Sequence, residues 1–266
     1  MSMQPSEKAG KDNRKKSLPF RILRRTVRLF VKKYKLYGTE NLPEEPCVLV
    51  GNHCQAYGPL AAEYCMPRKN YTWCVGEMLN RKEIPAYAFK DFWENNKPPR
   101  THWFYKMLGY LIAPLAAYAL SNAHTVPVYR DNRVVTTFRR SVDLLEEGAD
   151  IVIFPEKVDP YNAIIGEFNE YFSFLARIYY QKTQKALRFT PMYIAPNLNS
   201  IHFGKPVCYN PEGDDRAEIH RISAEIMKAI TDIAVALPEH TVVPYVNMPK
   251  NQYPKNTDSR PALRAE

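Results

Sequence analysis

The chain has 266 residues, of which 45 % are hydrophobic and 24 % are charged. These values are typical of one sizeable folded domain and exclude a low-complexity or largely disordered chain. The net charge of +9 is uneven, because residues 8–35 carry twelve Lys/Arg and one Asp, a net +11, and the rest of the chain therefore sums to −2. A near-neutral body with a basic N-terminal arm predicts that one end of the molecule meets an anionic surface, either phospholipid or nucleic acid.

The five cysteines and the lengths of the apolar segments indicate in which cellular compartment the protein works. No C-x-x-C pair occurs, which argues against a disulfide framework or a zinc ribbon and favours reduced thiols in a cytoplasmic protein. We expect no signal peptide, because no apolar stretch of adequate length follows the basic N-terminus. The most apolar segment, 107–120, is shorter than the roughly 18 residues that span a bilayer and contains Gly109 and Pro114, so a buried or an interfacial helix is expected there.

The basic arm divides into two parts. Residues 1–16 are polar and highly charged without periodicity, which predicts a disordered tail. A helix is predicted over 17–35, with Pro19 in its first turn. Its apolar residues recur on one face at helical spacing and cations cover the remainder; the apolar set is Phe20, Leu23, Val27, Phe30, Val31 and Tyr34. Such a basic amphipathic helix is typical of a membrane surface, and the alternative is a helix packed on the core with a solvated basic face.

The rest of the chain alternates between predicted strands and helices. Short apolar runs predict strands at 48–51, 71–75, 124–129, 151–154 and 187–194. Helices are predicted at 59–65, 100–121 with a break near Pro114, 134–147 closed by Gly148, 167–185 and 216–237. This alternation predicts an α/β fold with a mostly parallel central sheet flanked by helices, in one domain over 17–240. Residues 241–266 are expected to form a C-terminal tail, loose after Pro249.

Three polar motifs follow predicted strands, at the ends where parallel sheets bind ligands. His53 comes directly after strand 48–51 and precedes a Gly58-Pro59 turn, an arrangement that exposes an imidazole, although a single histidine is more often structural. Arg130 follows strand 124–129, and Glu156 with Lys157 follows strand 151–154. Taken alone, a charge at a strand end is more often a solvated surface group.

In this order and spacing, the motifs over residues 40–237 resemble those of the 1-acylglycerol-3-phosphate acyltransferase family. Asn52-His53 matches the start of the family's N-H-x4-D motif, and Val126-Pro127 with Arg130 matches its second motif. Phe154-Pro155-Glu156 matches the start of its F-P-E-G-T-R motif. Later similarity is found at Thr190-Pro191-Met192 and at Gly204-Lys205-Pro206-Val207.

The resemblance implies transfer of a fatty acyl group from acyl-CoA or acyl-carrier protein to the hydroxyl of a lysophospholipid such as 1-acylglycerol-3-phosphate. His53 would be the general base. Arg130 would hold the acceptor phosphate with help from Lys157, and Glu156 would orient that arginine or bind an acceptor hydroxyl. Gln55 and Tyr57 flank His53 and are expected to line the acceptor site or simply to pack.

The same resemblance implies a setting for this chemistry. No metal or other cofactor is expected beyond the acyl donor itself. We expect a peripheral protein on the cytoplasmic face of a membrane, with an anionic membrane surface, a lysophospholipid and an acyl donor as its partners.

Two departures from the family pattern bear on activity. Gly58 stands where the family has the Asp that orients the histidine, and Lys157, Val158 and Asp159 stand where Gly, Thr and Arg are expected. Another group would then have to orient His53, either a backbone carbonyl or one of Glu63, Glu77 and Asp159. The alternative function is a catalytically inactive lipid-binding or scaffolding homologue on the same fold. Retention of His53, Arg130 and Glu156 together favours the enzyme.

Two further features are less specific. The aromatic residues Trp103, Phe104, Tyr105 and Tyr110 are consistent with an acyl-chain seat, a headgroup contact or ordinary helix packing. Nucleic-acid binding through the basic arm is a third possible function. The arm's apolar residues Phe20, Phe30 and Val31 favour a bilayer over a phosphate backbone, so no nucleic-acid partner is expected.

Overall fold

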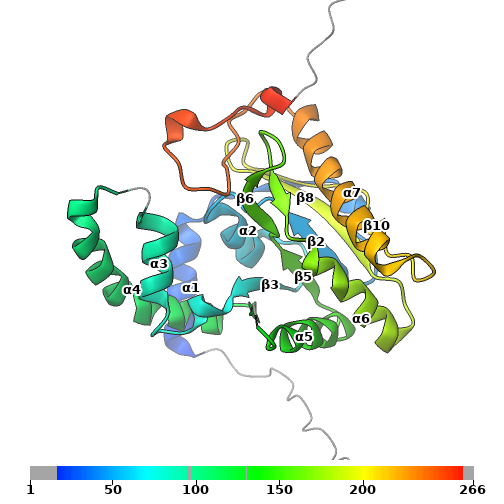
Figure 1. Ribbon diagram of the computed structural model, residues 1–266, viewed down its shortest axis with the longest axis horizontal. Helices are drawn as coiled ribbons and strands as arrows, with labels where there is room; N and C mark the ends of the chain where they lie inside the picture. Colours follow the sequence, from blue (N-terminus) through cyan, green and yellow to red (C-terminus); the bar gives the residue numbers. More distant parts are fainter. Residues whose placement is uncertain (1–16, 95–96, 130, 260–266) are drawn as a thin grey trace, which may run out of the picture.

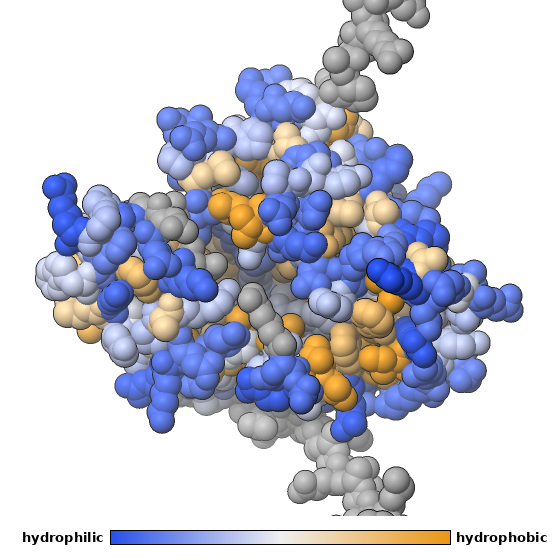
Figure 2. Space-filling view, in the orientation of Figure 1, coloured by the Kyte–Doolittle hydropathy of each residue, from blue (hydrophilic) through white to orange (hydrophobic). Residues whose placement is uncertain are grey.

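The computed structural model describes residues 17–94, 97–129 and 131–259 (Figure 1). The predicted tail 1–16 and the predicted phosphate ligand Arg130 lie outside the described residues. The predicted fold class is confirmed, because a mostly parallel central sheet is flanked by helices. Most of the surface visible in Figure 2 is hydrophilic, with smaller apolar areas between charged residues.

The central sheet has eight strands. Seven of them lie in the order β1 (Lys35–Tyr37), β9 (Ser200–Phe203), β8 (Arg188–Ala195), β2 (Val48–Gly51), β5 (Asp150–Ile153), β3 (Asn70–Val75), β4 (Thr125–Val128). The eighth strand, β10 (Val207–Cys208), pairs with β8. All neighbouring pairs are parallel except β9 and β10 against β8. β2 therefore lies between β8 and β5, which puts its carboxyl end at the middle of one edge of the sheet.

The strands are buried on both faces. Val48 and Val50 of β2 join the larger core cluster with residues of α5 (Val134–Glu146), α6 (Phe174–Thr183) and α7 (Asp215–Ala236). Leu49 points to the opposite face and joins a second cluster with residues of α2 (Tyr57–Cys65). This is why the sequence shows continuous apolar runs rather than alternation, as expected for parallel strands covered on two sides.

Two helix predictions differ from the structure. Residues 167–185 do not form one helix, because Gly166–Phe168 is strand β7, paired antiparallel with β6 (Glu156–Pro160), and α6 begins only at Phe174. The extended conformation is held by the Gly166 N–H, which donates to the Glu156 carboxylate. Helix α4 (His102–Asn122) runs without interruption through Pro114, since one lost backbone hydrogen bond is outweighed by packing against α3 (Ile84–Ala88).

The C-terminal segment is packed rather than loose as far as residue 259. Asn256 is fully buried, and its amide donates to the carbonyls of Ala234 (2.8 Å) and Leu237 (3.2 Å) at the end of α7. Its side-chain oxygen accepts the His240 N–H at 2.9 Å. The last carbonyls of a helix need donors from outside the helix, and Asn256 supplies them here.

The helix predicted over 17–35 is present as α1 (Leu18–Phe30), with Ser17 as its N-cap, but it ends five residues earlier than predicted because the backbone is extended from Val31 and Lys35 begins β1. Most of its predicted apolar face points inward. Phe20 is 3 % exposed and its ring meets Tyr118 of α4 edge-on at 6.3 Å. Phe30 is 84 % exposed, and Leu18, Ile22 and Leu29 of the same helix are also exposed. The expectation that Phe20 faces a bilayer is therefore wrong. No helix among the described residues is long and apolar enough to cross a membrane.

Candidate active site

Asn52 fixes the point where the chain leaves strand β2. Its side-chain amide donates to the Ile194 carbonyl of β8 at 3.0 Å, and its side-chain oxygen accepts the Ile194 N–H at 2.7 Å. The side chain is buried, where an unpaired amide would be costly. This pair of bonds ties the carboxyl end of β2 to the neighbouring strand and sets the direction in which residue 53 projects.

The turn after His53 adopts an uncommon backbone conformation. Cys54 and Gln55 have φ angles of +40° and +54°, in the left-handed region that residues with a Cβ seldom adopt. The turn closes with hydrogen bonds from the Tyr57 N–H to the Cys54 carbonyl (3.0 Å) and from the Gly58 N–H to the His53 carbonyl (3.1 Å). Such conformations gather at functional sites, because the surrounding structure must hold them in place.

Glu156 holds the His53 turn to the β6–β7 hairpin. One carboxylate oxygen accepts the backbone N–H of His53 at 2.6 Å, and the other accepts the N–H of Gly166 at 2.8 Å. Burial raises the pKa of Glu156 to about 7, although the two backbone donors oppose this shift. The structure thus brings together two of the predicted site residues, through the main chain of His53 rather than through its ring.

The imidazole of His53 lies between two aromatic rings. Its centroid is 5.4 Å from that of Phe154 and 5.2 Å from that of Tyr245, both in edge-on geometry. Nδ1 is buried and has no hydrogen-bond partner among the described residues. Burial lowers the pKa of the imidazole to about 4, and backbone groups of Gln55 and His53 itself offset only part of this shift. His53 is therefore neutral at physiological pH.

The turn leaves no space for a side chain at Gly58. A Cβ at this position would lie 2.3 Å from the His53 carbonyl oxygen and 3.2 Å from the ring of Phe154. The backbone of the 53–58 turn fills the space in which a side chain would begin, so no Asp fits here without a change of turn conformation.

No other carboxylate within the described ranges hydrogen-bonds to the His53 ring in place of the missing Asp. Of the three acids considered for this role, Glu63 pairs instead with Arg24 (3.1 Å) and His124 (3.4 Å). Neither Glu77 nor Asp159 makes a hydrogen bond to the ring.

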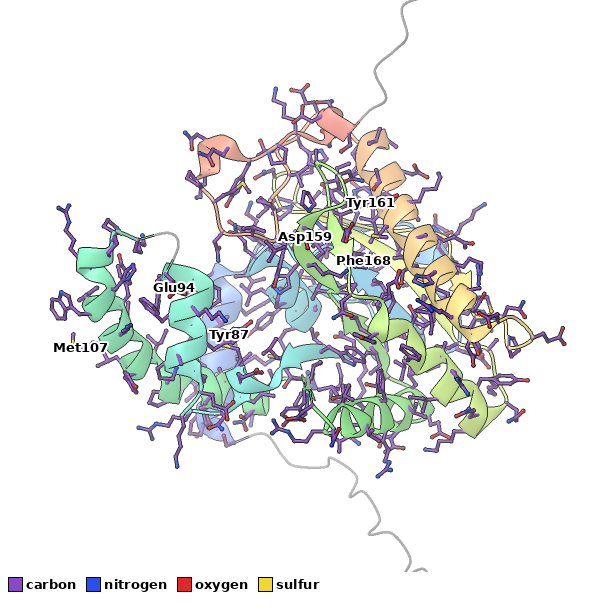
Figure 3. All side chains as sticks on the ribbon, in the orientation of Figure 1. Tyr87, Glu94, Met107, Asp159, Tyr161 and Phe168 are labelled. Atoms are coloured by element: carbon purple, nitrogen blue, oxygen red, sulfur yellow. The ribbon has the colours of Figure 1, made fainter. Side chains whose placement is uncertain are left out.

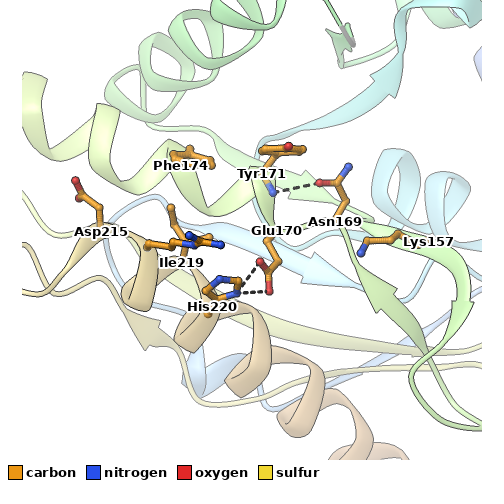
Figure 4. Close-up of a pocket in the computed structure, with 9 residues that line it drawn as sticks. Lys157, Asn169, Glu170, Tyr171, Phe174, Asp215, Ile219 and His220 are labelled. Carbon is orange, nitrogen blue, oxygen red and sulfur yellow. Dashed lines mark hydrogen bonds and ion pairs between the residues drawn. The ribbon is translucent and has the colours of Figure 1, made fainter.

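The remaining predicted site residues are directed elsewhere. Gln55 donates to the hydroxyl of Tyr253 at 2.9 Å, and the Tyr57 ring lies under the Lys32 ammonium, 5.6 Å from its centroid. Lys157 pairs with Glu167 at 3.6 Å and lines a separate cavity of about 550 Å³ (Figure 4). Successive strand residues point to opposite faces, which is why Lys157 diverges from its neighbour at position 156.

Sequence reasoning missed three residues that contact the site. Tyr245 packs on the His53 ring, Tyr253 holds Gln55, and Gly166 shares the Glu156 carboxylate. Tyr245 and Tyr253 belong to the segment expected to be a tail, nearly two hundred residues from the histidine. Only Gly166 offers a local signal, since a glycine ten residues after a strand-end acid is consistent with a hairpin.

Comparisons with known proteins give a likeness in structure but none in sequence. No protein-family model matches the chain, and no curated protein matches it in sequence. Among solved structures, the chain is similar to the 1-acyl-sn-glycerophosphate (LPA) acyltransferase PlsC from Thermotoga maritima, with 11 % sequence identity and a TM-score of 0.46. The similarity covers 82 % of this chain and 79 % of that chain. At this identity and TM-score, the likeness carries no conclusion about function.

Proposed function

We propose that the chain is a divergent acyltransferase of the 1-acylglycerol-3-phosphate acyltransferase type. It would move a fatty acyl group from acyl-CoA or acyl-carrier protein to the hydroxyl of a lysophospholipid such as 1-acylglycerol-3-phosphate. The observation that carries the proposal is the 2.6 Å contact between the Glu156 carboxylate and the backbone of His53. Two motif residues that lie 103 positions apart meet at the carboxyl ends of adjacent parallel strands, where such sheets bind ligands.

The chemistry assigned to His53 is general base catalysis. The neutral imidazole accepts the proton of the acceptor hydroxyl, whose oxygen attacks the thioester carbonyl, and the imidazolium then returns a proton to the leaving thiolate. Since Nδ1 is buried, Nε2 is the nitrogen assigned to this transfer. The burial that keeps the ring neutral also weakens it as a base, because the imidazolium is poorly solvated.

The acceptor phosphate would be held by a cation at the same edge of the sheet. Arg130 follows β4 in the sequence and is the proposed ligand. Lys157 is a weaker candidate than its sequence position suggested, because its ammonium is directed toward Glu167 and a different cavity. Gln55 and Tyr57 are proposed to shape the entrance to the site through the segments they contact.

The proposed location is the cytoplasmic face of a membrane, with the protein bound peripherally to anionic lipid. Helix α1 supports this proposal with the exposed apolar residues Leu18, Ile22, Leu29 and Phe30. Exposed Arg21 and Arg25 lie among them, and the helix contains no acidic residue. Cations beside exposed apolar groups favour an anionic leaflet.

One observation favours a second candidate, a lipid-binding homologue without catalytic activity. The His53 Nδ1 is buried and has no partner in the part of the chain that the structure describes, and the turn at Gly58 excludes the acid that would orient it. A general base with no group to fix its tautomer loses much of its efficiency.

Release of free thiol from acyl-CoA in the presence of lysophosphatidate separates the two candidates. We expect turnover by the wild type and a loss of about 100-fold or more in His53→Ala, in line with the usual contribution of general base catalysis. His202→Ala is the matched control, because His202 stacks on Tyr37 at the far edge of the sheet. Equal turnover by His53→Ala and wild type would refute the catalytic role, and an inactive wild type that binds lysophosphatidate would support the second candidate.

A further inference from the structure

Helix α4 packs on the protein through its small residues. Gly109 and Ala113 are buried, and a Cβ at Gly109 would lie 3.2 Å from the Cα of Pro85 in α3. Ile84 and Ala88 complete this contact with Ala113. The close approach of the two helices leaves no room for large side chains between them, so the large apolar residues of α4 lie elsewhere.

Those large residues face outward. Five of them are between 53 % and 76 % exposed and fall on one face at helical spacing, namely Trp103, Met107, Tyr110, Leu111 and Leu115. Met107 points away from the rest of the protein in Figure 3. A surface helix of a soluble protein buries its large apolar face and exposes its small or polar one, and α4 has the reverse arrangement.

Helix α4 is in contact with helix α1. The Ser17 hydroxyl at the start of α1 is 2.7 Å from the Tyr118 hydroxyl of α4, and the Phe20 and Tyr118 rings meet edge-on. The two helices together present the apolar residues of α4 named above and Leu18, Ile22, Leu29 and Phe30 of α1. Large apolar side chains exposed in this number on one pair of helices are typical of an interaction surface.

The charged residues around this surface indicate what kind of partner it binds. Neither 17–35 nor 97–122 contains an Asp or Glu, whereas Lys97, Arg100 and Lys106 belong to or precede α4 and Arg21 and Arg25 are exposed on α1. A surface of exposed leucines, tyrosines and a tryptophan with cations only fits the interface of an anionic bilayer. A second copy of the same chain would place these cations against one another.

We propose that the outward faces of α4 and α1 form the membrane-docking surface, with α4 as the helix that enters the bilayer interface. Trp103 and Tyr110 lie at headgroup level, and Leu111 and Leu115 reach the acyl boundary. The role of this surface, which is to bring His53 to a lipid acceptor, rests on the proposed function. Membrane binding by the surface is tested separately, without a measurement of enzyme activity.

Vesicle flotation tests the surface directly. The probe is phosphatidylcholine vesicles with about 30 % phosphatidylserine. We expect Leu111→Glu to lower the vesicle partition coefficient by about 10-fold or more, because a charge replaces an apolar anchor. Val135→Glu is the matched control, since Val135 is 55 % exposed on α5, and it should bind as the wild type does. Both sites are exposed, so circular dichroism should show unchanged folding.

Two results would overturn the proposal. One is wild-type flotation by Leu111→Glu. The other is a wild-type dimer that Leu111→Glu dissociates without loss of flotation, which would make the face an interface between copies. Thiol release with detergent-dispersed acceptor separates this proposal from the function. If His53→Ala keeps full turnover while Leu111→Glu loses flotation, the surface stands and the catalytic assignment fails.

Discussion

The buried pair of Glu156 and His53 predicts a hidden pH dependence of stability. Burial raises the pKa of Glu156 from 4.5 to about 7 and lowers that of His53 from 6.5 to about 4. The folded state therefore binds more protons than the unfolded state at Glu156 between pH 4.5 and 7, and fewer at His53 between pH 4 and 6.5. The first difference makes stability fall as pH rises, and the second makes it rise.

The two contributions are of similar size and opposite sign. Each shift corresponds to about 3 kcal/mol at 1.36 kcal/mol per pKa unit. Over the common window they largely cancel, so the pair adds little pH dependence to the wild type. His53→Gln removes the contribution that rises with pH, and its free energy of unfolding relative to that of the wild type should fall by about 3 kcal/mol from pH 4 to 6.5. Glu156→Gln should show the reverse, a gain of about 3 kcal/mol relative to the wild type from pH 4.5 to 7.

Urea unfolding at half-unit pH steps measures these differences, since all other titrating groups are common to the variants and cancel. The free energy of unfolding of the double variant should change with pH in the same way as that of the wild type. Single variants whose free energy of unfolding runs parallel to that of the wild type across pH 4–7 would refute the reasoning, because the two groups would then have ordinary pKa values in the folded state.

Two other predictions concern backbone packing and a helix end. Gly58→Asp should lower the free energy of unfolding by about 2 kcal/mol and restore no activity, because its Cβ meets the His53 carbonyl. Gly213→Ala, whose Cβ would have only ordinary contacts, is the control in urea unfolding, and an equally stable Gly58→Asp would contradict the model of a closed turn. Asn256→Ala should cost about 1–3 kcal/mol by leaving α7 carbonyls unpaired, seen as a lower melting temperature. An unchanged melting temperature would show that water replaces the amide.

The sheet could be predicted from the sequence because its strands are buried on both faces. Val48 to Gly51 and Ile151 to Phe154 are short apolar runs bounded by turn residues, and each placed a polar motif residue just past its end. His53 was therefore located at a strand end without any tertiary information. Its neighbour in space, Glu156, followed from the rule that parallel strands end at the same edge.

The direction in which helix faces point could not be predicted. The periodicity of α1 identified an apolar face correctly, but only the structure shows that Phe20 packs on Tyr118 while Leu29 and Phe30 face outward. In α4 the apolar residues surround the helix, and the close packing of Gly109 on Pro85 decides which of them are exposed. A hydrophobic pattern shows which residues of a helix share a face, but it does not show which element packs against that face.

The hairpin and the C-terminal contacts were missed for a different reason. Gly166 to Phe168 is extended because its backbone completes the hydrogen bonds of Glu156, a side chain ten residues away. Tyr245 and Tyr253 reach the His53 turn from the far end of the chain. Neither effect leaves a local trace in amino-acid composition, since each depends on the completed fold.

The turn at Gly58 also constrains how this sequence can change. An aspartate at position 58 would not by itself restore the missing partner of His53, because the His53 carbonyl lies where the new Cβ must go. The same turn holds Cys54 and Gln55 in left-handed conformations, so a side chain at position 58 and the path of residues 53–58 would have to change together. Engineering a partner acid for His53 would therefore require redesign of the whole 53–58 turn rather than a single substitution.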